Sequence, residues 1–307
     1  MSNSENKPND NLAPYAALIA VQLFFGSLPV IAKVVLKVIP PISLVGFRVG
    51  ITALVLIVIQ TGRGRFWLKE KGDYWRFALL SLFGVTFNQL LFINGLSRTK
   101  ASNTSLLAVT IPIFALTVGA IVGAERLRAV KIAGIVLAAA GVLIIINPQN
   151  ASFSSETTLG DMMIVLNSLS FGIYVATSKS IVTRNGAFRS MMWVFVFAAI
   201  VCVPLGAWWF SSVDAATVEP VIWLLVLHIA LIATAAPYLL NAWALARVNP
   251  STVAVFIYLQ PLIGFLLAVA FLGEHIDSTF IIAALLIFAG VFLVTKKFAS
   301  PENNESV

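Results

Sequence analysis

Nine amides and tyrosines interrupt the apolar runs of this sequence, and they are the side chains best suited to hold a small molecule. They are Gln22, Asn88, Gln89, Asn167, Tyr174, Tyr238, Asn241, Tyr258 and Gln260. An amide facing lipid would leave its donors unpaired at a cost of several kcal/mol, so these side chains must face helices or water. Two uses remain open: bonds between helices, worth about 0.6 kcal/mol each, or contact with a substrate. Amides beside aromatic rings favour a small amphipathic or aromatic metabolite over a polyanion.

The basic residues set a limit on the substrate. A phosphorylated molecule would need Lys or Arg near the middle of the membrane. The nearest candidates lie near the ends of apolar runs: Lys33, Arg48, Arg98, Lys179 and Arg247. At such positions a long basic side chain ordinarily reaches for the lipid headgroups.

His228 is the one histidine well inside an apolar run. An imidazole pKa near 6.5 would let it carry a proton under physiological conditions, which makes it a candidate for proton coupling. The alternative is a neutral histidine bonded between helices.

Catalytic and metal-binding patterns are absent from the sequence. Cys202 has no partner for an internal disulfide, and there is no His/Glu metal spacing and no glycine-rich phosphate loop with a lysine. We therefore expect neither an enzyme nor a metal or cofactor, and no direct use of ATP.

Glycine and proline within the apolar runs predict mechanical roles. Proline removes a backbone hydrogen bond, kinks the helix and frees a carbonyl. The candidate hinge residues are Gly26, Pro112, Pro261 and Gly264. The alternative is ordinary close packing, because both residue types are common in membrane helices.

Composition indicates that lipid is the solvent for most of the chain. Of 307 residues, 59% are hydrophobic and 11% are charged, against about 25% charged in soluble domains. A membrane span takes about 20 residues, and ten apolar runs come close to that length. They are 14–34, 42–61, 75–96, 102–122, 130–147, 159–181, 190–210, 221–245, 251–272 and 279–295. The sequence thus predicts an all-α integral membrane protein with ten transmembrane helices.

The positive charge indicates membrane orientation more than nucleic-acid binding. The net charge is +7, and the basic residues cluster between the apolar runs. With the N-terminus in the cytoplasm, the outer side holds five of the 20 Lys and Arg residues, namely Lys33, Lys37, Arg48, Arg98 and Lys100. The excess on the other side predicts that both termini are cytoplasmic.

An internal repeat divides the chain into two halves. Segment 96–142 recurs without a gap as segment 245–291, which is 149 residues later. The informative matches are Arg98 with Arg247, Pro112 with Pro261, and Glu125 with Glu274. We predict two five-helix repeats, 14–147 and 159–297, between polar cytoplasmic tails 1–13 and 298–307. Because five is odd, the second repeat must be inverted, which places the two glutamates at opposite membrane faces.

The motifs resemble the drug/metabolite transporter superfamily, specifically proteins with two EamA domains. The resemblance rests on Phe25-Gly26-Ser27, Asn94-Gly95-Leu96, Gly123-Ala124-Glu125-Arg126-Leu127 and Ala140-Gly141-Val142, and on Leu272-Gly273-Glu274 and Ala289-Gly290-Val291 in the second half. It implies ten helices, a cavity between the halves and alternating access in the bacterial inner membrane. It also implies that Lys33 and Arg48 lie at the outer mouth of the cavity, as gating or charged residues.

The expected function is secondary transport, with export of a small organic metabolite that is amino acid-like or aromatic. Uptake is the main alternative, and a receptor or a membrane enzyme acting on lipids is a more distant one. The expected partners are the substrate and the lipid bilayer, with no nucleic acid, and the protein would be a monomer or a homodimer.

Overall fold

The computed structural model describes residues 12–146, 157–263, 266 and 278–296, and these residues form helices and connecting loops without a strand. The α-helices are α1 (Ala13–Val35), α2 (Pro41–Gly62), α3 (Gly72–Ser81), α4 (Phe87–Arg98), α5 (Ala101–Ala108), α6 (Thr110–Ile121), α7 (Ala129–Ile146), α8 (Thr158–Asn185), α9 (Ala187–Phe210), α10 (Pro220–Ala230), α11 (Ala236–Leu245), α12 (Pro250–Val255) and α14 (Ser278–Thr295). Two π-helical segments are η1 (Leu82–Thr86) and η4 (Leu231–Ala235), and two 3₁₀ segments are η3 (Ala215–Thr217) and η5 (Phe256–Tyr258).

Six continuous apolar helices in the described residues are long enough to cross a membrane. They span 13–35, 41–62, 72–98, 158–185, 187–210 and 220–245. Shorter apolar helices, over 106–121, 129–145, 250–263 and 280–295, fall on the four other predicted runs.

The sequence repeat is also a structural repeat. The π-helical segments η1 and η4 begin at Leu82 and Leu231, which are 149 residues apart. The fourth apolar run breaks at Val109, and the equivalent run in the second half turns into η5, which ends at Tyr258. Each break lies just before a proline of the predicted pair, Pro112 or Pro261, because neither ring can donate the hydrogen bond that would continue the helix.

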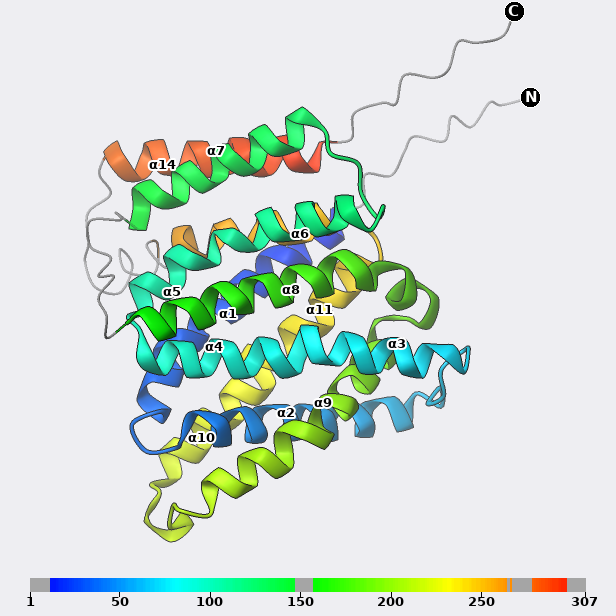
Figure 1. Ribbon diagram of the computed structural model, residues 1–307, viewed down its shortest axis with the longest axis vertical. Helices are drawn as coiled ribbons and strands as arrows, with labels where there is room; N and C mark the ends of the chain where they lie inside the picture. Colours follow the sequence, from blue (N-terminus) through cyan, green and yellow to red (C-terminus); the bar gives the residue numbers. More distant parts are fainter. Residues whose placement is uncertain (1–11, 147–156, 264–265, 267–277, 297–307) are drawn as a thin grey trace, which may run out of the picture.

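Equivalent helices of the two halves pack against each other at one end of the molecule, where α7 and α14 lie side by side (Figure 1). A β-carbon on Gly134 would lie 2.8 Å from the Gly290 carbonyl oxygen, and one on Gly141 would lie 2.7 Å from the Ala283 carbonyl oxygen. Gly290 is the repeat equivalent of Gly141, and Ala283 that of Gly134. Such reciprocal contacts define a twofold relation, and their order along the chain makes the two helices antiparallel.

The opposite end of the long axis is formed by α2 and α9, which also come from different halves (Figure 1). A β-carbon on Gly46 would lie 2.9 Å from the Cys202 carbonyl oxygen and from the Gly206 α-carbon. Small residues at these contacts let the helix backbones approach closely. Most of the remaining helices lie between these two pairs, and α10 lies beside α2 (Figure 1).

Close packing, the alternative to a hinge, is not seen at Gly26 among the described residues, because a β-carbon there would meet nothing of them within 4 Å. The hinge role of Gly26 stays a prediction. Gly264, the other predicted hinge glycine, lies outside the described residues, as does Glu274.

Candidate functional site

A cavity lies between the two halves, and most of the predicted polar residues line it. Its volume is about 110 Å³. A single water needs about 10–15 Å³ by this measure, so the cavity is larger than a packing defect. Seven of the nine predicted amides and tyrosines face it: Gln22, Asn88, Gln89, Asn167, Tyr238, Asn241 and Gln260.

Apolar rings and one cation complete the wall. Phe25, Phe92 and Phe171 supply aromatic surface, and Arg48 lines the same space. The cavity thus has the mixture that small-molecule sites show, an apolar lining with a few convergent polar groups.

Tyr238 connects the polar groups of the two halves. Its hydroxyl lies 2.9 Å from the carbonyl oxygen of Gly84, 3.0 Å from Asn88 Oδ1 and 3.0 Å from Gln89 Nε2. A hydroxyl has one proton. It can therefore donate to Gly84 or to Asn88 while it accepts from Gln89, and the choice can change when a ligand enters.

The amides are paired across helices in this structure. Asn88 Nδ2 donates to Asn167 Oδ1 at 2.6 Å, and Gln260 Nε2 donates to Gln22 Oε1 at 2.8 Å. Each pair joins one half of the chain to the other. The two uses considered from the sequence, interhelical bonding and cavity lining, therefore belong to the same side chains.

The cavity lies on the twofold axis that relates the halves. Gln89 and Tyr238 are 149 positions apart, so they are repeat equivalents, and yet they are hydrogen-bonded. A residue can touch its own symmetry equivalent only near the axis. Tyr258 shows the same relation, since its hydroxyl donates to the carbonyl of Val109, also 149 positions away, at 2.8 Å.

The π-helical segments supply backbone acceptors to this region. The Gly84 carbonyl in η1 accepts from Tyr238 of the second half at 2.9 Å. Its repeat equivalent in η4, the Ala233 carbonyl, accepts from Arg48 of the first half at 3.4 Å. Pro237 cannot donate to Ala233 four residues before it, so that carbonyl is free for a side chain. Single π-helical turns within α-helices often occur at functional sites.

Arg48 reaches further into the protein than its place in the sequence indicated. Although it lies only two turns after the start of α2, its side chain is 1% exposed and lines the cavity. The guanidinium Nε and Nη2 donate to Thr234 Oγ1 at 3.0 and 2.8 Å. Arg48, which the family resemblance placed at the outer mouth of the cavity, thus lies on the cavity wall.

Two predicted site residues are not among those that line the cavity. The ring of Tyr174 contacts the position where a β-carbon of Gly84 would lie, and its hydroxyl is 3.6 Å from the sulfur of Met191. Tyr258 is bonded to Val109, as described above. Both tyrosines support the irregular backbone around the cavity.

Lys33 and His228 also lie away from the cavity lining. Lys33 Nζ donates to the carbonyl of Thr99 at 2.9 Å, and Thr99 Oγ1 donates to Asp161 Oδ1 at 2.6 Å. Asn103 Nδ2 adds a bond of 3.1 Å to the same carboxylate. His228 is partly buried, with Nε2 3.5 Å from Ser27 Oγ.

Asp161 ties the two halves together at the end of the helix bundle where α8 begins, because Thr99 and Asn103 belong to the first half. It was not singled out from the sequence. The available signal was an acidic residue in the first turn of an apolar run, where the helix dipole favours negative charge.

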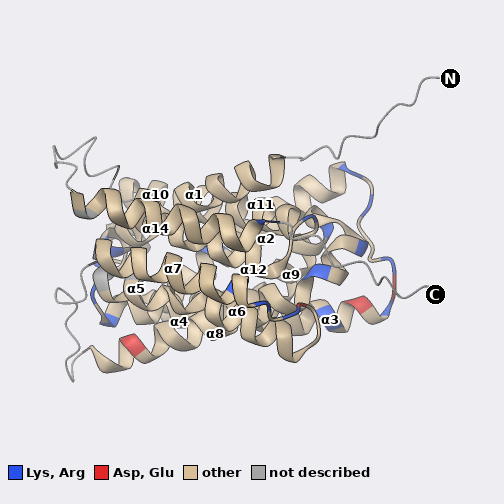
Figure 2. Cartoon of the chain, turned by 90° about the horizontal axis from the view of Figure 1, so that it is seen from above, with Lys and Arg blue, Asp and Glu red and all other residues tan. Residues whose placement is uncertain are grey.

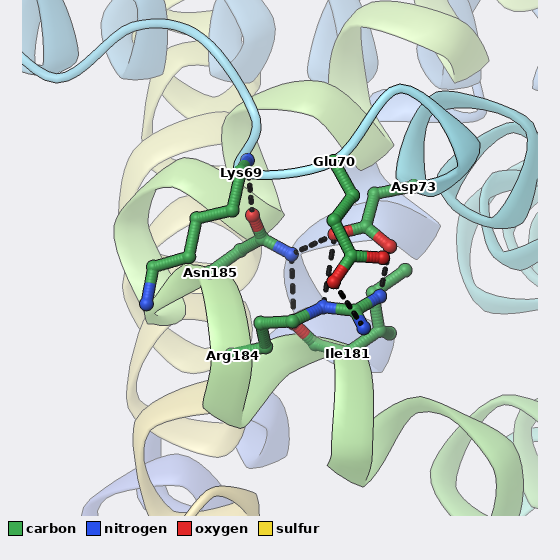
Figure 3. A network of polar contacts seen from close by, with 6 residues as sticks. All are labelled: Lys69, Glu70, Asp73, Ile181, Arg184 and Asn185. Carbon is green, nitrogen blue, oxygen red and sulfur yellow. Dashed lines mark hydrogen bonds and ion pairs between the residues drawn. The ribbon is translucent and has the colours of Figure 1, made fainter.

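Charged contacts between the halves also occur at the other end of the helix bundle, where α3 begins and α8 ends. Asp73 at the start of α3 is fully buried and binds Arg184 of α8, whose guanidinium also contacts Glu70 at 3.0 Å (Figure 3). Asn185 Nδ2 donates to Asp73 Oδ2 at 2.7 Å, and Asn185 Oδ1 accepts from the backbone N–H of Lys69 at 3.0 Å.

Glu125 makes a second contact between the halves at that end. Its carboxylate accepts from the backbone N–H of Ser251 at 3.0 Å and also binds the Ser251 hydroxyl and Lys131. Ser251 begins the fourth apolar run of the second half, so this contact joins the repeats directly.

Duplicated apolar helices around a polar cavity on the twofold axis define a membrane protein of the carrier type. The model of the EamA-like transporter family matches residues 12–147 and again residues 158–296. The chain therefore belongs to the EamA-like transporter family, as the motifs predicted, and it is a multi-pass membrane protein.

Relatives of known sequence agree with this assignment. An "Uncharacterized transporter" of Archaeoglobus fulgidus is 26% identical over 94% of this chain and 99% of its own length. "Uncharacterized transporter YoaV" of Bacillus subtilis is 25% identical over 92% of this chain and 96% of its own. "Protein RarD" of Escherichia coli is 30% identical over 69% of this chain and 71% of its own. One crystal structure shares the fold with a TM-score of 0.72 at 20% identity, covering 92% of this chain and 96% of that chain.

Proposed function

We propose that this protein is a secondary transporter that exports a small organic metabolite across the bacterial inner membrane by alternating access. The observation that carries the proposal is the position of the cavity on the axis between equivalent halves, where Gln89 and Tyr238 touch. Rocking one half against the other around such a site exposes it to each side in turn.

The contacts between the halves fit this mechanism. Asp161 with Thr99 and Asn103 ties the halves at one end, and Asp73 with Arg184 ties them at the other. In a rocking mechanism, the contacts at one end must loosen when the site opens there. The proline breaks before Pro112 and Pro261 would supply bending points, in accordance with their predicted hinge role.

In the proposed topology, ten helices cross the membrane and both termini are cytoplasmic. Most of the basic ribbon lies at the end of the molecule around the start of α3 (Figure 2). A second cavity at that end, with a volume of about 820 Å³, is lined by Arg63, Arg65, Arg189 and Arg247. An excess of arginine and lysine favours the cytoplasmic side.

Transport itself is tested by counterflow in proteoliposomes loaded in turn with amino acids, nucleosides, sugars and small organic acids. We expect exchange of at least one compound class, and loss of exchange when Asn88 is replaced by Leu. Absence of exchange for every compound would contradict a transport function. Direction is tested in cells, where export predicts that expression lowers the internal level of the transported compound and uptake predicts the reverse.

Alternating access is tested by cysteine labelling. Ala108 lines the cavity, and Val58, 71% exposed on the outer surface of α2, serves as the control. With the native Cys202 replaced by Ala, A108C should react with a membrane-impermeant thiol reagent from both sides of oriented vesicles, and V58C from neither. Labelling of A108C from one side only would contradict alternating access.

A further inference from the structure

Arg48 presents a buried charge that no protein carboxylate neutralises in the described part of the chain. Its side chain is 1% exposed, and no ion pair with it is found among the described residues. One edge of the guanidinium is held, with Nε and Nη2 bonded to Thr234 Oγ1 and Nη2 also to the Ala233 carbonyl. The remaining nitrogen, Nη1, is buried and has no hydrogen-bond partner within the described ranges.

An arrangement of this kind is costly unless something else completes it. A charged side chain at membrane depth costs at least about 2.5–3.5 kcal/mol, and such residues generally mark substrate or ion pathways. A buried N–H without an acceptor adds a further penalty. Because Arg48 lines the cavity, a ligand in the cavity is placed to remove both costs.

The side-chain type indicates which ligand group would do so. The planar fork of arginine is well suited to anions. In Arg48 the part of the fork left for a ligand is Nη1 with its two N–H groups, and a charge-assisted bond from it to a carboxylate is about twice as strong as a neutral one. Thr234 fixes the orientation of the fork through Nε and Nη2, so little further ordering is needed when an anion binds.

The rest of the wall limits the ligand to a single charge. The other polar side chains on it are neutral: Gln22, Asn88, Gln89, Thr104, Asn167, Tyr238, Asn241 and Gln260. Phe25, Phe92 and Phe171 offer surface for an apolar or aromatic body. No acidic side chain of the described residues lines the cavity.

We propose that the cavity binds a small monocarboxylate, whose carboxylate is recognised by Arg48 and whose apolar or aromatic body lies against the phenylalanine rings. This inference rests on the proposed transport function and names the substrate class for the same site. It also revises the expectation from the sequence, in which Arg48 was a residue near the end of an apolar run and not a ligand-binding residue of the cavity wall.

The test compares carboxylates with neutral amides of the same size. The purified protein is titrated with phenylacetate and phenylacetamide, and with isovalerate and isovaleramide, with thermal stabilisation as the readout. The carboxylates should stabilise the wild type and the amides should not. In R48Q, carboxylate affinity should fall about tenfold or more, while R76Q, a change at an exposed arginine, should behave as wild type.

Two further variants keep the outcome interpretable if R48Q folds poorly. R48K retains the charge without the fork, and T234V removes the hydroxyl that orients the guanidinium. Both should weaken binding of the carboxylates. Equal binding of amides and carboxylates, no binding of either carboxylate, or unchanged carboxylate binding in R48K and T234V would overturn the proposal.

The same compounds in proteoliposome counterflow separate this inference from the function on which it rests. Exchange of neutral compounds alone would retain the transporter and overturn the carboxylate site. Binding that depends on Arg48 without exchange of any compound would retain the site and overturn transport.

Discussion

Replacing Tyr238 with Phe removes one hydroxyl from the centre of the cavity wall. The hydroxyl takes part in two bonds at a time, accepting from Gln89 and donating to either Gly84 or Asn88. At about 0.6 kcal/mol for each interhelical bond, their loss costs about 1.2 kcal/mol. A buried group left unpaired costs about 1–3 kcal/mol, so we expect the substitution to lower the free energy of unfolding by about 1–3 kcal/mol.

The matched control is Tyr174→Phe, which removes a hydroxyl whose neighbour is a methionine sulfur at 3.6 Å. Sulfur is a weak acceptor, so this change should cost less than about 0.5 kcal/mol. The aromatic contacts of Tyr238 with Phe25 and Phe195, at ring distances of 6.0 and 5.1 Å, do not need the hydroxyl. The phenyl ring should therefore keep its place.

The assay is equilibrium unfolding of both variants in mixed micelles with increasing SDS. A free energy for Y238F within about 0.3 kcal/mol of wild type, well below the expected loss, would refute the reasoning. So would an equal loss in Y174F, because the effect would then come from tyrosine hydroxyls in general. In counterflow, Y238F should also alter substrate affinity, whereas Y174F should not.

Three other changes test separate features. Gly290→Ala places a β-carbon 2.6 Å from the Ala138 backbone nitrogen and should destabilise the protein by about 1–3 kcal/mol. Gly26→Ala, whose β-carbon would meet none of the described residues within 4 Å, should be neutral. Equal thermal stability of the two variants would contradict the packing. If His228 couples proton movement to transport, His228→Gln should abolish the pH dependence of flux in proteoliposomes, and an unchanged pH profile would exclude that role. Asp73→Asn removes the buried charge from the ion pair with Arg184 of α8. The free energy of unfolding should fall by about 1–3 kcal/mol, less than for a fully buried pair, because the arginine is partly exposed. An unchanged free energy of unfolding would show that this ion pair is not an important contact between the halves.

Much of the cavity wall could be predicted because lipid penalises unpaired amides. Gln22, Asn88 and Asn167 had to face the protein interior, and the space they share is the cavity. The proline pair likewise indicated where helices break, since a missing N–H acts locally whatever surrounds it. Both predictions depended on properties that a residue carries with it.

Other features depend on neighbours that are distant in the sequence. No residue pattern marks the π-helical segments in the sequence, and the Gly84 and Ala233 carbonyls within them accept hydrogen bonds from Tyr238 and Arg48 of the opposite halves. The depth of Arg48 could not be predicted because α2 is apolar on every face, so its pattern does not show which side is buried. The same ambiguity applied to Tyr174, which packs on Gly84 instead of lining the cavity.

The residues on the axis have a consequence for the resting state of the protein. If the halves were identical, an inward-open form would be the outward-open form turned over, and the two would have equal free energy. The contact of Gln89 with Tyr238, and the different partners of the Gly84 and Ala233 carbonyls, break that equality at the place where both forms must share a site. In the proposed alternating-access mechanism, the side to which the empty protein opens is therefore set by differences between equivalent residues, and exchanging such a pair is expected to change the balance between the forms without altering the fold.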